Sequence, residues 1–163
     1  MRAKLLWLTV TLLAASMVFS AALWVHRESV LTAACDGVGS AVGQIQFAGH
    51  LLEQDPSAAG QREAAYVVAQ AVGQLLEAAP VVAQEGYAEI SVTSFSLGLQ
   101  AFEGRLQDGR ESRKLVERQA KALAGLGPGI SRTFRTDAFS ALGRDLLEKL
   151  PTVTRAFKAA GVF

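Results

Sequence analysis

The feature that most constrains the fold is an uncharged apolar segment near the N-terminus, from Leu5 to Val25. As an α-helix rising about 1.5 Å per residue, this segment would be roughly 31 Å long. The hydrocarbon core of a bilayer is about 30 Å thick, so the segment has the length of a transmembrane helix. We predict a cytoplasmic tip at residues 1–4, a transmembrane signal-anchor at residues 5–25 and one extracytoplasmic domain at residues 26–163.

The residues that flank this segment predict its orientation. Arg2 and Lys4 precede it, whereas the charges just after it cancel. Because positive charge is retained in the cytoplasm, we expect the N-terminus inside and the C-terminal domain outside the cytoplasmic membrane. Trp7 and Trp24 lie near the two ends of the segment, and indole rings favour the membrane–water interface.

A cleaved signal peptide is the alternative to an anchor. Ser20, Ala21 and Ala22 are small residues of the kind found at cleavage sites, and cleavage would release a secreted or periplasmic protein. The apolar run continues to Val25, however, and is longer than the apolar core of a signal peptide, which typically has about 7–15 residues. We therefore favour the uncleaved single-pass anchor.

Beyond residue 25 the apolar residues recur every three or four positions, which is the period of an amphipathic helix. Turn-forming pairs and prolines divide this region into segments at about 26–53, 56–79, 81–107, 111–126 and 131–150, with a last stretch at 152–163. The pattern predicts an all-α protein, in which a small antiparallel bundle of four to five helices follows the single N-terminal transmembrane helix.

The segment at 81–107 is ambiguous, because residues 88–102 also alternate as a strand would. Its heptad seam, of the kind seen in coiled coils, consists of Ala88, Val92, Phe95, Leu99, Phe102 and Leu106. No second strand is evident to pair with this one, and an unpaired strand leaves its backbone unsatisfied. We therefore predict a helix, whose seam serves either as internal core or as an interaction face.

Charge is unevenly distributed along the domain. His26 to Gln107 carries 3 Lys+Arg against 9 Asp+Glu, and Asp108 to Phe163 carries 11 against 6. The net charge of the chain is +1, which gives no electrostatic reason to expect nucleic-acid binding. One basic cluster recurs at helical spacing and predicts either a solvated face or contact with an anionic surface, such as the outer leaflet or an acidic partner. Its members are Arg110, Arg113, Lys114, Arg118 and Lys121.

The remaining candidates for chemistry are few. Cys35 is the single cysteine, so it is either a small core residue or an intermolecular disulfide between two anchored copies. His50 and Glu53 share a helix face but provide only two ligands, whereas a metal site needs three or four. We find no phosphate-binding loop and no catalytic triad pattern, and we predict no catalytic residue, metal or cofactor.

These observations predict a membrane-anchored, non-enzymatic helical bundle that acts as a structural or protein-interaction module outside the cytoplasmic membrane. Its partner would be another membrane protein or a second copy of the chain. The alternative function is a sensor-like module that binds a small ligand between its helices.

Overall fold

The computed structural model describes residues 2–84, 86, 89–126 and 136–163, except for the side chains of residues 2–10, 89–90 and 136–138. The helices are α1 (Arg2–Gln54), α2 (Ala58–Gln84), α3 (Glu89–Asp108), α4 (Arg113–Ala124) and α5 (Thr136–Ala160). The described residues contain no strand. The predicted all-α bundle is therefore confirmed, and the strand alternative is wrong over the described residues 89–102.

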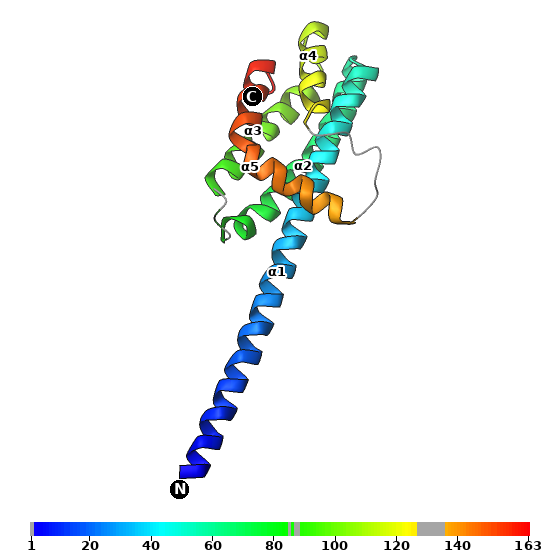
Figure 1. Ribbon diagram of the computed structural model, residues 1–163. Coiled ribbons are helices and arrows are strands. Elements are labelled where there is room, and N and C mark those ends of the chain that lie inside the picture. The colour runs from blue at the N-terminus through cyan, green and yellow to red at the C-terminus, as the bar shows by residue number, and fades with distance from the viewer. Residues whose placement is uncertain (1, 85, 87–88, 127–135) are drawn as a thin grey trace.

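The helix α1 has two halves in different surroundings (Figure 1). Its N-terminal half projects from the bundle, and residues 11–30 are all exposed. From Ala34 onward one face enters the core, where Val38, Ile45 and Leu52 are fully buried. The helix α1 is continuous, so the apolar segment runs without a break into the first amphipathic segment.

The buried half of α1 packs against α2, α4 and α5, and small residues allow a close approach. A Cβ atom on Gly39 would lie 2.0 Å from the carbonyl oxygen of Phe139, and one on Gly143 would lie 2.1 Å from that of Cys35. The backbones of α1 and α5 therefore touch where they cross, because neither position carries a side chain.

Ser57 and Asp55 together hold the turn between α1 and α2. The Ser57 hydroxyl accepts the backbone N–H of Ala59 at 3.2 Å and so caps α2. The Asp55 carboxylate accepts the backbone N–H of Ser57 at 2.9 Å. The Ser57 hydroxyl and backbone N–H, in that order, lower the pKa of Asp55 below its ordinary value.

Two prolines do not end their helices, which corrects two predicted breaks. The helix α2 passes through Pro80, and α5 passes through Pro151 to include most of the stretch at 152–163. A proline inside a helix removes one backbone hydrogen bond, to the carbonyl four residues earlier. Both prolines are exposed, so their rings face solvent and displace no core side chain.

By length and composition, α2 is the one helix among the described residues that could cross a membrane. It lies in the middle of the chain, and half of its most apolar stretch is buried inside the bundle, as expected for a core helix. The side chains of residues 2–10 lie outside the described part of the chain. The anchor at residues 5–25 therefore stays a prediction.

Candidate functional site

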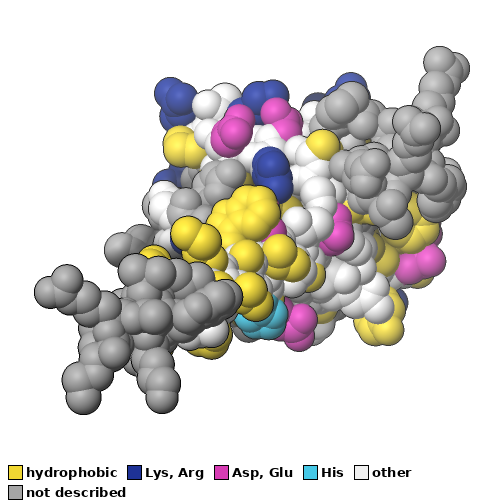
Figure 2. All heavy atoms as spheres, turned by 60° about the horizontal axis from the view of Figure 1, so that its bottom comes forward, with side chains coloured by type: hydrophobic (Ala, Val, Ile, Leu, Met, Phe, Trp, Pro, Cys, Tyr) yellow, Lys and Arg dark blue, Asp and Glu magenta, His cyan; other side chains and the backbone are white. Residues whose placement is uncertain are grey.

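The projecting half of α1 exposes apolar side chains around its whole circumference. Met17, Val18 and Phe19 are 69%, 71% and 65% exposed, and successive residues of a helix point about 100° apart. Trp24 is 63% exposed, whereas the side chains of Arg2, Lys4 and Trp7 lie outside the described residues. Figure 2, turned so that the lower end of Figure 1 comes forward, shows a group of hydrophobic side chains on this face of the molecule.

The predicted heptad seam is internal. Five of its residues are 0–2% exposed, namely Val92, Phe95, Leu99, Phe102 and Leu106, and Ala88 lies outside the described residues. The Phe95 ring stacks on that of Phe157, with 5.6 Å between centroids. Of the two uses predicted for the seam, the structure shows core packing, so these side chains present no face to a partner.

Cys35 is also internal, since its side chain is fully buried. It lies where α1 touches α5, within reach of the Gly143 backbone. A disulfide requires the two Cα atoms to approach within about 7 Å, which a second chain cannot do through a packed helix. The burial of Cys35 agrees with the first alternative, a small core residue, and it leaves the thiol out of reach of a second copy while the bundle is folded.

The basic cluster lies on and just before α4, at the end of the bundle opposite the projecting half of α1 (Figure 1). Its members differ in their contacts. Arg113 forms an exposed ion pair with Glu117 at 2.9 Å, and Arg118 donates to the carbonyl of Ala160 at 3.1 Å. The other three cations, of Arg110, Lys114 and Lys121, are exposed and have no hydrogen bond or ion pair with a described residue.

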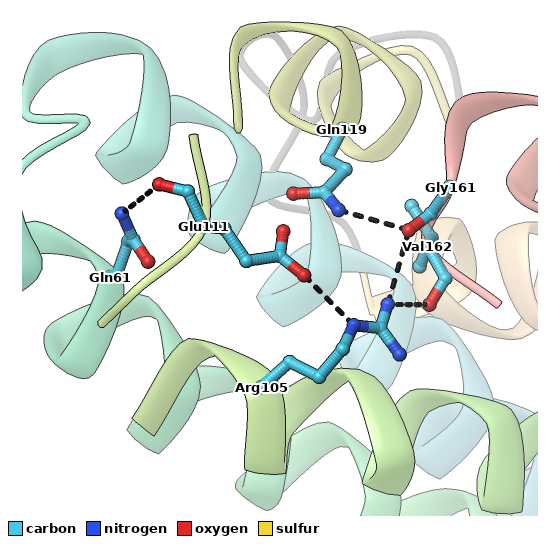
Figure 3. Close-up of polar contacts among 6 residues, drawn as sticks. All are labelled: Gln61, Arg105, Glu111, Gln119, Gly161 and Val162. Atoms are coloured by element: carbon cyan, nitrogen blue, oxygen red, sulfur yellow. Dashed lines mark hydrogen bonds and ion pairs between the residues drawn. The ribbon is translucent and has the colours of Figure 1, made fainter. Parts of the chain in front are cut away.

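A polar cluster at the same end holds the C-terminal turn (Figure 3). The Arg105 guanidinium donates to Glu111 at 2.8 Å and to the carbonyls of Gly161 and Val162 at 3.1 and 2.7 Å. Gln119 also donates to Gly161, at 2.9 Å. These donors satisfy carbonyls that the end of α5 would otherwise leave unpaired. We call this set of five residues the C-terminal clamp.

The clamp was missed by the sequence analysis. Arg105 is separated by 56 and 57 residues from the carbonyls that it binds, so no local pattern connects them. The only signal is that Arg105 is the one Lys or Arg between residues 63 and 109. An isolated cation near the end of an otherwise acidic segment indicates a specific partner.

A groove of about 370 Å³ lies between α3 and α5. Phe95, Leu150 and Phe163 provide apolar walls, and Ser91, Ser94, Thr154 and Lys158 provide polar groups. Every residue in this set is described, and none was singled out from the sequence as a ligand contact. We call it the α3–α5 groove.

His50 and Glu53 lie together as their spacing predicts, with 3.3 Å between Nδ1 and Oε2, and both side chains are largely exposed. Among the described residues no group of three His, Cys, Asp or Glu side chains could hold a metal ion. In comparisons with protein-family models, curated proteins and solved structures, nothing matches the chain.

Proposed function

We propose that this protein is a membrane-anchored, non-enzymatic helical bundle that presents an interaction surface outside the cytoplasmic membrane. Residues 5–25 form the anchor, with the N-terminus inside and residues 26–163 outside. The observation that carries the proposal is the projecting half of α1, which is apolar and exposed all round.

A lipid environment accounts for this half of α1 better than water does. A helix that is apolar on every side is typical of a buried or membrane-spanning segment, and soluble proteins rarely expose contiguous apolar patches above a few hundred Å². No described residue covers positions 11–30, which are exposed throughout. Arg2 and Lys4 before the segment favour retention of the N-terminus in the cytoplasm.

The continuity of α1 fixes how far the basic cluster would lie from such a membrane. The backbone of Gly49 closely approaches Ala120 and Ala124 of α4, and Gly49 is 24 residues beyond Val25. A helical rise of about 1.5 Å per residue places this contact roughly 36 Å above the anchor. Charges are screened over about 8 Å at physiological ionic strength, so the outer leaflet is too distant to be the anionic surface.

The proposed contact is therefore an acidic surface on a neighbouring membrane protein that reaches the distal end of the bundle. Arg110, Lys114 and Lys121 are exposed there without partners among the described residues, which leaves their charges free for such a surface. Exposed charges of this kind steer association and set the choice of partner more than they add affinity.

The anchor is tested by the intact mass of the protein extracted from membranes with detergent. A full-length mass, with or without the initiator methionine, supports the anchor. A mass lacking about twenty residues, together with recovery in the soluble fraction, would contradict it. The protein would then be an exported, soluble helical bundle.

The interaction surface is tested by a photoreactive residue at position 117 of α4 in intact membranes. We expect a crosslinked product that is lost when Arg110, Lys114 and Lys121 are all replaced by Gln. The matched control replaces Arg144, Lys149 and Arg155 of α5 by Gln, with the same change in charge and no loss. Monomer alone in the unsubstituted protein would refute the surface, and a product of exactly two chains would identify a second copy as the partner.

A further inference from the structure

The α3–α5 groove has the size and chemistry of a small-molecule site. Its volume of about 370 Å³ lies within the range of roughly 300–1,000 Å³ found for ligand pockets. Such pockets combine apolar walls with a few polar groups that fix the orientation of the ligand. The proposed anchor and the basic cluster do not use this groove.

The apolar part of the groove is built from aromatic rings held in place by their neighbours. Phe95 is 1% exposed, and its ring meets that of Phe163 edge to face, with 5.3 Å between centroids. The Phe163 ring lies against Gly98, where a Cβ atom would come within 2.8 Å of it. The C-terminal clamp fixes the turn that precedes Phe163. The aromatic wall is therefore formed before any ligand arrives, which lowers the ordering cost of binding.

The polar groups of the groove have no partners within the described chain. The hydroxyls of Ser91, Ser94 and Thr154 make no hydrogen bond there, and the Lys158 ammonium makes no ion pair. Similar residues nearby are engaged elsewhere. Ser96 donates to the carbonyl of Val92 at 2.9 Å, and Lys149 pairs with Asp145 at 2.5 Å.

We propose that the α3–α5 groove binds a small aromatic monocarboxylate. The ring of the ligand packs against the partly exposed Phe163, which the buried Phe95 supports from within the core, since aromatic pairs favour edge-to-face and offset contacts. The carboxylate faces Lys158, and the serine and threonine hydroxyls donate to its oxygens as charge-assisted hydrogen bonds. One cation matches one negative charge, whereas phosphate is commonly held by arginine forks. This site is independent of the anchor.

The test uses the full-length protein in phosphatidylcholine nanodiscs, with phenylacetate and its neutral analogue phenylacetamide as probes. Binding is measured by titration calorimetry, and empty nanodiscs correct for partition into lipid. We expect saturable binding, with phenylacetate preferred over phenylacetamide by about tenfold, the gain typical of one charge-assisted contact.

Three variants make the test specific. Lys158→Met should abolish the preference for phenylacetate, whereas Lys149→Met, on the same helix outside the groove, should retain it. Ser94→Leu fills the exposed mouth of the groove and should weaken both probes by at least about tenfold. All three positions are exposed, and an unchanged far-UV circular dichroism melt would verify folding. The proposal is overturned by an absence of saturable phenylacetate binding at millimolar concentration, or by a preference that persists in Lys158→Met.

Discussion

The two halves of α1 are parts of one helix, yet they occupy opposite environments. In the projecting half, apolar side chains point in every direction and remain exposed. In the buried half, the apolar residues form one stripe, and glycines replace side chains where other helices cross. Apolar sequence is plentiful in both halves but denser in the projecting one, since hydrophobic residues fill 13 of the 20 positions 11–30 and 12 of the 24 positions 31–54. Its arrangement around the helix therefore decides which half is covered by protein.

The largest effect is expected from charges in the projecting half. Leu13→Arg combined with Met17→Arg places two charges in the proposed span, at a cost of about 5–7 kcal/mol for membrane insertion. We expect extraction into alkaline carbonate, with little change in bundle stability. Phe47→Arg with Tyr66→Arg, at exposed sites on the bundle, should leave the protein in the membrane. Retention of both variants in the membrane would show that the projecting half of α1 does not span it.

The buried half contains glycines that lie against another helix and glycines that do not, and replacement by alanine should affect them differently. Gly39→Ala places a Cβ atom 2.0 Å from the Phe139 carbonyl oxygen and should destabilise the bundle by about 2–3 kcal/mol. Gly37→Ala meets nothing within 4 Å and should stabilise it by up to about 1 kcal/mol. Urea unfolding followed by far-UV circular dichroism measures both. Equal effects at the two positions would show that the α1–α5 contact is not tight.

The buried half of α1 is protected by the helices that pack on it, and the C-terminal clamp joins two of them, α4 and α5, to α3. Loss of the clamp should therefore expose the buried half and leave the projecting half unaffected. Arg105→Met leaves the Glu111 carboxylate, which is only 10% exposed, without its cation and should cost about 2–3 kcal/mol. Hydrogen exchange should accelerate at residues 34–52 and stay unchanged at residues 11–30. Arg113→Met removes an exposed pair and should cost less than about 1 kcal/mol. Equal acceleration in both halves would contradict this account.

The smallest effect concerns the residue that follows α1. The folded-state pKa of Asp55 is lowered, so its contribution to stability is present above the unfolded pKa and is lost as pH falls through the folded pKa. We expect Asp55→Asn to be less stable than the unsubstituted protein at about pH 7, and we expect this difference to shrink as the pH falls below the unfolded pKa and through the folded pKa. Ser57→Ala removes the main cause and should reduce this difference. A difference that persists in acid would exclude a charge effect.

The sequence was informative where the signal is local. The period of the apolar residues predicted the helices, and the heptad spacing identified Phe95, Leu99 and Phe102 as one face. The heptad spacing did not show whether this face is part of the core or a docking surface, because its burial depends on which other helices pack against it. Pro80 and Pro151 were interpreted as breaks, since sequence alone does not tell that a proline ring faces solvent.

The sites that were missed join residues far apart in the chain. The clamp connects Arg105 with Gly161 and Val162, and the groove joins α3 with α5. Each contributing segment has an ordinary amphipathic pattern. The position of these sites therefore depends on which segments pack together, and the sequence of one segment does not show this. Cys35 illustrates the same point, because its burial depends on the crossing of α5.

The uninterrupted course of α1 also gives the molecule a lever arm. From Val25 to the end of the helix at Gln54, the arm is about 44 Å long. A change of about 10° in tilt at its base would displace the far end by roughly 8 Å. In the proposed anchored state, the tilt of the spanning helix would adjust to the thickness of its bilayer, and the height and lateral position of α4 would follow the lipid composition beneath it.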